Sequence, residues 1–348
     1  MTTQSPTRPP APARERAVSR RRRWVWLAAA LALVAVAAVV SVAFGTRVVS
    51  LGDVVGALVG KDEGIAAAAV RARVPRTVLA LLVGAALGLA GAVMQGVTRN
   101  PLGDPGILGI TMGASLAVVS GIAFLGITTL PQYVWFALVG AALTSVFVYL
   151  VGSIGRGGPT PLKLALAGAA TTAAFSSLVS AILLPRIDVM NVFRFWQIGG
   201  VGGATWEAIG IVLPFLVVGT ALTLASARGL DALALGDDLA TGLGVHVTRA
   251  RVLAAVGAVL LAGAATAVAG PIAFVGLVVP HAARLVVGVD HRWVLPFSAL
   301  TGAVLLTLAD VIGRVVARPG EIEVGIVTAL IGAPVFVALA RRRRVVQL

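Results

Sequence analysis

The stretch from Thr77 to Val97 is almost continuously apolar. Such a run is long enough for a helix to cross the ~30 Å hydrocarbon layer of a membrane. Small residues recur along it at intervals of four, at Gly84, Gly88, Ala92 and Gly96. A stripe of small side chains lets neighbouring helices approach closely inside a membrane. The stretch therefore predicts a central membrane helix that is packed on several sides.

The rest of the chain has the same apolar character. Of its 348 residues, 58% are hydrophobic and 12% are charged, whereas soluble domains have about 25% charged residues. We predict an all-α membrane protein of about ten transmembrane helices. Residues 1–23 are predicted to form a disordered basic cytoplasmic tail, and residues 24–348 a transmembrane domain. The ten apolar segments are residues 24–44, 77–97, 106–125, 133–151, 162–184, 206–227, 252–268, 271–289, 293–312 and 324–340.

The positions of Lys and Arg predict the orientation of the chain. With both termini in the cytoplasm, 19 of the 28 Lys and Arg residues fall in cytoplasmic tails and loops. This is the positive-inside pattern of multi-pass proteins. The net charge of +14 is therefore assigned to topology and to anionic lipid headgroups, and nucleic acid is not an expected partner.

Nine cationic residues remain on the external side. Arg73 and Arg76 lie at the N-terminal end of the central helix, where the helix dipole disfavours positive charge. An anionic partner that docks from outside would compensate for this, and so would membrane headgroups reached by snorkelling side chains. Arg314 lies four residues after Asp310, a spacing that favours an ion pair within one helix.

A glycine-rich segment separates the fifth and sixth apolar segments. Gly199, Gly200, Gly202 and Gly203 lie within five residues, and glycine permits unusual backbone angles and close approach. The composition is consistent with a hinge or a short broken helix at the external mouth, and equally with a plain flexible loop.

The longest cytoplasmic loop, residues 228–251, contains leucines at i+4 spacing after two acidic residues that suit the first turn of a helix. We predict a short amphipathic helix that closes at a glycine. Its apolar side needs a cover, either the protein's own helices or a second protein such as a cytoplasmic motor subunit. The leucines are Leu235, Leu239 and Leu243, and the acidic residues are Asp237 and Asp238.

No catalytic or metal site is apparent in the sequence. The chain has no cysteine, which excludes disulfides and thiolate ligands. Its three histidines lie apart, and the adjacent Asp237 and Asp238 are a weak metal signature without further oxygen ligands. The chain also lacks a phosphate-binding loop with the spacing of an ATPase. We therefore predict no enzyme activity and no cofactor.

Five stretches together resemble the permease family of bacterial iron–siderophore ABC importers, which also includes cobalamin and haem permeases. The resemblance implies the type II importer permease fold in the cytoplasmic (inner) membrane, with ten transmembrane helices per subunit. It also implies a second permease subunit, identical or paralogous, two cytoplasmic ATPase subunits and an extracytoplasmic substrate-binding protein. The stretches are residues 73–110, 234–245, 270–292, 308–314 and 325–343.

The resemblance also assigns roles to particular residues. External arginines in this family meet acidic residues on the binding protein, which gives that role to Arg73, Arg76 and Arg314. The glycine-rich segment 199–203 is a candidate pathway or gating element. The loop motif corresponds to the coupling helix that seats in a groove of the ATPase. Its residues here are Leu235, Gly236, Asp237, Asp238, Leu239, Leu243 and Gly244.

One position departs from the family pattern. Relatives commonly have a proline where this chain has Glu323. The departure alters the local turn and adds negative charge near Arg314.

The resemblance implies that the chain imports ferric siderophore by alternating access. Cobalamin or haem is the alternative cargo. An ion-coupled secondary transporter would need carboxylates or histidines inside the membrane, and the first seven apolar segments have essentially none in their middles. A structural or signalling membrane protein is a third alternative, and such a protein would not stimulate a partner ATPase.

Overall fold

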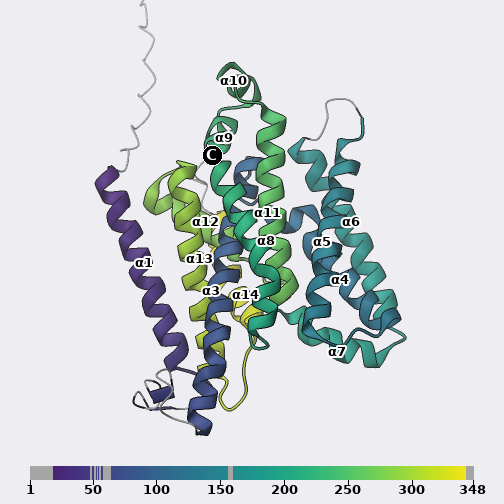
Figure 1. Ribbon diagram of the computed structural model, residues 1–348. Coiled ribbons are helices and arrows are strands. Elements are labelled where there is room, and N and C mark those ends of the chain that lie inside the picture. Colours follow the sequence, from purple (N-terminus) through teal and green to yellow (C-terminus); the bar gives the residue numbers. More distant parts are fainter. Residues whose placement is uncertain are drawn as a thin grey trace, which may run out of the picture.

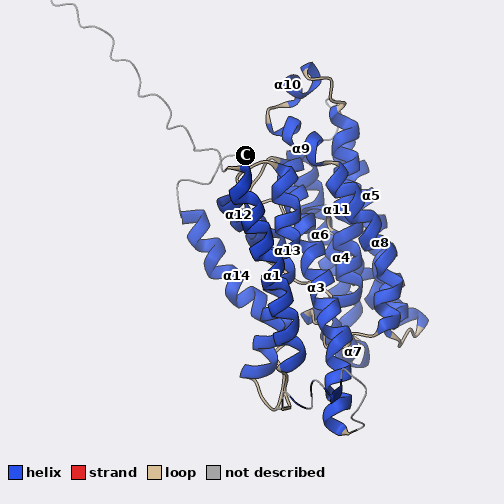
Figure 2. Ribbon diagram, turned by 60° about the vertical axis from the view of Figure 1, so that its left-hand side comes forward, coloured by secondary structure: helices blue, strands red, loops and turns tan. Residues whose placement is uncertain are grey.

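The computed structural model describes residues 19–47, 49–50, 52, 54, 56–57, 64–155 and 160–341. Within these ranges all regular structure is helical (Figure 2). Most of the predicted tail, residues 1–18, lies outside them. The helices are α1 (Arg20–Ala43), α3 (Ile65–Thr98), η1 (Pro105–Leu108), α4 (Ile110–Ser120), η2 (Gly121–Leu125), α5 (Leu130–Ser153), α6 (Pro161–Leu183), α7 (Ile187–Ile198), α8 (Trp206–Ala225), α9 (Ala227–Ala234), α10 (Asp237–Gly242), α11 (Val247–Ala269), α12 (Val275–Val287), α13 (His291–Val316) and α14 (Val324–Arg341).

The predicted membrane segments are present as helices. Seven helices in the described ranges are long and apolar enough to cross a membrane. Three shorter apolar helices, Ile110–Leu125, Val275–Val287 and Val324–Ala338, bring the total among the described residues to ten. Each of the ten predicted segments overlaps one of these helices, which confirms the all-α membrane fold. The remaining α-helices, α7, α9 and α10, lie in the connections between spans.

Helix α3 lies at the centre of the fold, as its small-residue stripe predicts. Of its most apolar window 78% is buried inside the protein, against 17% for α1 and for α6. A Cβ added at Gly84 would overlap the backbone of Gly302 in α13, and one added at Gly91 would overlap the backbone of Gly276 in α12. The missing side chains therefore let α3 contact two neighbouring helices backbone to backbone.

Helix α1 begins earlier than predicted. We expected the disordered tail to reach residue 23, but the helix starts at Arg20. The side chain of Ser19 caps it by accepting a hydrogen bond from the backbone N of Arg22 at 3.4 Å. The Nη1 atom of Arg23 also lies 3.5 Å from Oδ2 of Asp290. These contacts stabilise the helical conformation of residues 20–23.

Helix α12 is too short to cross the membrane alone. Its 13 residues extend about 20 Å, and the preceding residues 270–274 continue as irregular backbone, with Phe274 at φ +69°. The predicted eighth segment started at Pro271, whereas the helix starts four residues later. Irregular backbone at membrane depth is tolerated where protein covers it, and Gly270 is buried.

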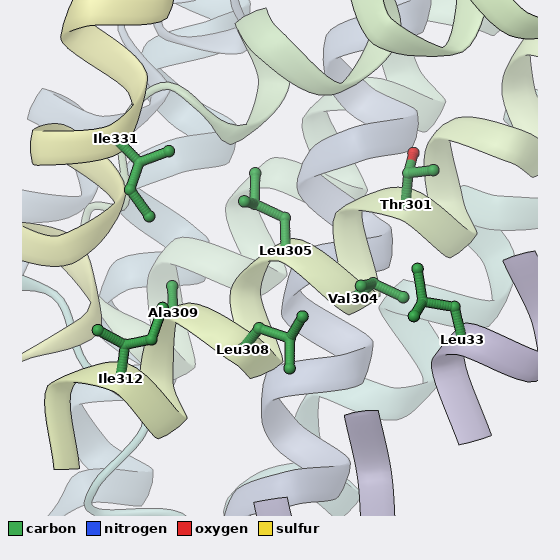
Figure 3. A pocket seen from close by; sticks show the side chains of 8 residues that line it. All are labelled: Leu33, Thr301, Val304, Leu305, Leu308, Ala309, Ile312 and Ile331. Carbon is green, nitrogen blue, oxygen red and sulfur yellow. The ribbon is translucent and has the colours of Figure 1, made fainter. Parts of the chain in front are cut away.

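A pocket of about 310 Å³ lies along α13 between α1 and α14. Figure 3 shows Leu33 of α1 and Ile331 of α14 on either side of the α13 side chains. Thr301 is the one polar residue among the eight that line it. The pocket offers no charged group that could hold a charged solute.

The helices that connect the spans lie at two opposite ends of the molecule. Helices α9 and α10 lie at one end, together with the start of α1 and the end of α14 (Figures 1 and 2). Helix α7 and the start of α3 lie at the other end (Figure 1). We call these the loop end and the arginine end, after residues 227–251 and after Arg73 with Arg76. Helix α13 has 26 residues, about 39 Å, and reaches from one end to the other.

Candidate functional site

The loop end presents apolar side chains outside the fold. Helix α9 buries Leu230 and Leu233 completely against the helix bundle. Leu235, Leu239 and Leu243, in contrast, are 57%, 61% and 65% exposed. The sequence predicted apolar residues here that need a cover, and the structure shows that the bundle covers only the α9 leucines.

Two ion pairs fix the position of α10. Oδ1 of Asp237 accepts a hydrogen bond from Nη2 of Arg251 at 2.8 Å and another from Nη2 of Arg99. Arg99 is the left-handed residue that ends α3, and Arg251 is the fifth residue of α11. Asp237 therefore ties the leucine-bearing segment to two long helices. The sequence did not predict these two arginine partners of Asp237.

Helix α9 is tied to α13 through a third polar contact. Oδ1 of Asp231 accepts a hydrogen bond from the backbone N of His291 at 2.9 Å and lies 2.7 Å from its Nδ1. The His291 ring is buried and packs against Gly96 of α3, where an added Cβ would lie 2.9 Å from Nε2. Neither Asp231 nor His291 was among the predicted site residues, because their spacing of 60 residues carries no local pattern.

The sequence-predicted pair of Asp310 and Arg314 is present at the arginine end, and Arg76 joins it. Nη2 of Arg314 lies 2.9 Å from Oδ2 of Asp310. Arg76 donates from Nε and Nη2 to the same carboxylate at 2.8–3.2 Å, and from Nη1 to Glu321 at 2.7 Å. Two guanidiniums therefore share one carboxylate that is 1% exposed. This Asp310 network, comprising Arg76, Asp310 and Arg314, joins α3 to α13.

The C-terminal end of α1 supplies further partners for these arginines. Arg73 donates from Nη1 to the carbonyl oxygens of Val42 and Ala43 at 3.1 and 2.9 Å. Arg314 donates from Nη1 to the carbonyl oxygens of Ser41 and Phe44, each at 3.1 Å. The last carbonyls of a helix lack partners within it and carry the negative end of the dipole.

The arginines therefore find their compensating negative charge inside the chain. Arg73, Arg76 and Arg314 are all buried. The sequence argument required an acceptor for these charges but could not identify the end of α1 as one. Direct contact of the three side chains with a binding protein stays a prediction.

The glycine-rich segment lies at the arginine end, beside two other irregular segments. The backbone N of Gly200 donates to the carbonyl of Ala269 at 2.8 Å, and that of Gly325 donates to the carbonyl of Gly199 at 3.0 Å. An added Cβ at Gly202 would lie 3.5 Å from Nη1 of Arg76. Backbone hydrogen bonds thus join the segment that follows α7 to the end of α11 and to the start of α14.

Glu323 faces this segment, because an added Cβ at Gly200 would overlap its carboxylate. Burial raises the pKa of the Glu323 carboxyl, and the Arg76 charge acts in the opposite direction. The residue that replaces the family's usual proline therefore lies against the glycine-rich segment.

Replacing Gly199 with alanine is expected to destabilise the arginine end. Gly199 has φ +79°, and an added Cβ would overlap the carbonyl of Pro271. We expect a loss of about 1–3 kcal/mol, seen as a lower thermal unfolding midpoint of the purified protein. Gly203→Ala is the matched control, because nothing lies within 4 Å of its added Cβ. Equal midpoints for both variants would contradict the packing described here.

The described residues contain no group of three or more His, Asp or Glu side chains arranged to hold a metal ion. The predicted site residues form two groups, which lie at opposite ends of the molecule. One set is the arginines with the glycine-rich segment, and the other is the leucine loop at the opposite end.

Comparisons with known proteins agree with this architecture. The profile of the FecCD transport family matches residues 31–342. The chain is 46% identical over 273 residues to the iron(3+)-hydroxamate import system permease protein FhuB of Bacillus subtilis (strain 168), covering 78% of this chain and 71% of that protein. It is 47% identical over 273 residues to the ferric enterobactin transport system permease protein FepD of Escherichia coli (strain K12), covering 78% and 81% of the two chains.

A solved structure extends the match to three dimensions. It is a transporter assigned to the metal-chelate ABC type, in an inward-facing conformation, with a TM-score of 0.81 and 30% identity. The match covers 92% of this chain and 99% of that one. Family, fold and multi-pass membrane character are thereby confirmed, and the chain belongs to the FecCD transport family.

Proposed function

We propose that this chain is the permease subunit of an ABC importer that carries ferric siderophore across the cytoplasmic membrane into the cell. The observation that carries the proposal is the exposed leucine face of Leu235, Leu239 and Leu243 at the loop end. It supplies a surface for a partner ATPase in a chain that belongs to a transport family. The match to FhuB and FepD supports ferric siderophore over cobalamin or haem as the cargo.

The full importer in this proposal contains two permease subunits, two cytoplasmic ATPase subunits and an extracytoplasmic binding protein. The permease hydrolyses no ATP and forms no covalent bond with its cargo. Its contribution is a pair of conformations that bind the partners and the cargo differently.

The orientation proposed from the sequence places the loop end in the cytoplasm. The start of α1 (Figure 1) and the end of α14 (Figure 2) both lie at this end. The loop end also carries Arg99, Arg251 and Arg292, and the last described residue is Arg341. This charge distribution supports a cytoplasmic loop end.

The polar contacts of the loop suggest how ATPase movement reaches the membrane helices. A displacement of α10 acts on α3 and α11 through Asp237, and a displacement of α9 acts on α13 through Asp231. We propose the glycine-rich segment 199–203 as the gating element at the opposite end, next to Arg76.

The docking proposal predicts a loss of binding-protein affinity on charge reversal. Replacing Arg73 and Arg76 together with glutamate is expected to weaken docking by about tenfold or more, because repulsion replaces attraction. Titration of the binding protein against the purified complex measures it. Arg71→Glu is the control, since Arg71 is exposed on the same helix end. ATPase co-purification shows that the double variant is assembled, and unchanged docking in that variant would contradict the proposal.

Uptake by cells that lack only this chain tests the proposed cargo. Labelled ferric siderophores, cobalamin and haem are offered side by side under iron limitation. We expect loss of one siderophore class and its restoration by the intact gene. Loss of cobalamin or haem uptake instead would overturn the cargo assignment and leave the importer assignment in place.

A further inference from the structure

A pocket of about 600 Å³ lies at the loop end, between the first turns of α1 and α13. It is separate from the leucine face and from the Asp310 network. Three arginines, two tryptophans and one aspartate are among its lining residues. They are Arg20, Arg23, Trp24, Asp290, Arg292 and Trp293.

The charges of this pocket do not balance. Asp290 accepts hydrogen bonds from Nε and Nη2 of Arg292 at 3.0 and 3.1 Å, and from Nη1 of Arg23 at 3.5 Å. It is the one carboxylate among the lining residues, against three guanidiniums. The Nε atom of Arg23 is covered from solvent and has no hydrogen-bond partner. The pocket therefore retains positive charge and an unsatisfied donor.

Two tryptophan side chains pack around Arg23. The rings of Trp24 and Trp293 meet edge to face, with centroids 5.2 Å apart. The guanidinium of Arg23 lies over the Trp293 ring, 5.8 Å from its centroid. Tryptophan is enriched where membrane helices meet the headgroup layer, which places the pocket at that level.

The wall of the pocket changes character along the helices. Leu27 and Pro296 line it one turn further along α1 and α13 than the arginines and tryptophans. A ligand with an anionic head and an apolar tail would meet both parts, whereas a free anion would use only the first. We propose that this pocket binds the headgroup of an anionic phospholipid, with its phosphate between Arg20, Arg23 and Arg292.

The position of the pocket connects it to the loop. Asp290 and Arg292 flank His291, the residue that Asp231 of α9 holds. A bound lipid would fix the first turn of α13 against α1, which is otherwise a peripheral helix with 17% of its apolar window buried. The lipid would therefore steady one of the attachments of the loop.

Native mass spectrometry of the purified full-length chain tests the proposal. Phosphatidylglycerol and phosphatidylcholine are titrated against the wild type, Arg23→Gln/Arg292→Gln, and the control Arg21→Gln/Arg22→Gln. Like the pocket variant, the control removes two charges. Its residues lie beside Arg23 in the first turn of α1 but do not line the pocket. We expect the wild type and the control to prefer phosphatidylglycerol, and the pocket variant to bind it about tenfold or more weakly.

Arg292→Gln alone keeps the test valid if the double variant does not fold, because the Arg292 side chain is 60% exposed. An equal loss in the Arg21→Gln/Arg22→Gln control would overturn the proposal in favour of general surface charge. Binding of phosphatidylcholine as tight as that of phosphatidylglycerol would overturn it too. Displacement of the lipid by excess inorganic phosphate would show a free-anion site instead. None of these outcomes depends on the cargo or on transport.

Discussion

Replacing Leu235, Leu239 and Leu243 together with serine is expected to abolish transport while the permease remains folded. Each side chain is more than half exposed, so its loss creates no cavity in the fold. In the proposed complex these leucines are covered by the ATPase, and burial of a leucine contributes roughly 1.5 kcal/mol or more. Three such losses would weaken ATPase binding on the order of a thousandfold.

Co-purification of the ATPase with the tagged permease measures this effect, and siderophore uptake measures its consequence. Leu184→Ser is the matched control, because Leu184 is 87% exposed and follows α6 at the arginine end. The control should retain both the ATPase and uptake. A triple variant that still co-purifies with the ATPase would show that the leucine face serves another contact.

Asp310→Asn is expected to cause a large loss of stability. The Asp310 carboxylate pairs with Arg76 and Arg314, and all three residues are buried. The amide keeps the volume but leaves the buried Arg314 guanidinium without its carboxylate partner and Arg76 with Glu321 alone. Removing one partner of a buried ion pair costs about 3–5 kcal/mol. Thermal unfolding of the detergent-purified protein should show a markedly lower midpoint.

Glu321→Gln is the control for the Asp310 substitution. Glu321 also pairs with Arg76, at 2.7 Å, but its side chain is 35% exposed. Ion pairs with this exposure contribute up to about 1 kcal/mol, so the midpoint should move little. Similar midpoint losses in the two variants would mean that burial of the network does not determine its contribution to stability.

The membrane helices were predictable because each carries its own signal. A run of about twenty apolar residues must cross the membrane whatever its neighbours are. The errors occur where a boundary depends on another part of the chain. Helix α1 includes Arg20 to Arg23 because Ser19 caps it and Asp290 pairs with Arg23. Composition alone assigned those arginines to a disordered tail.

The residues of the candidate site were also predictable only where they carry a local sequence pattern. The leucines of the loop could be identified from their i+4 spacing and from acidic residues that begin a helix. The partners of Arg73 could not be identified, because it contacts Val42 and Ala43 through backbone carbonyls. Every residue has a carbonyl, so the sequence does not mark those that accept a hydrogen bond. The role of Asp231 was missed because its partner, His291, lies 60 residues away.

The backbone contact between α3 and α13 limits how this transporter can move. At Gly84 and Gly302 each backbone occupies the space that a side chain on the other would need. Helices that touch in this way cannot slide or roll against each other without a steric clash. The two helices should therefore move together as one rigid body. Arg99 and His291 connect this body to the loop end, and the Asp310 network holds the two helices together at the arginine end. The hinge must then lie among helices that pack through deformable side chains.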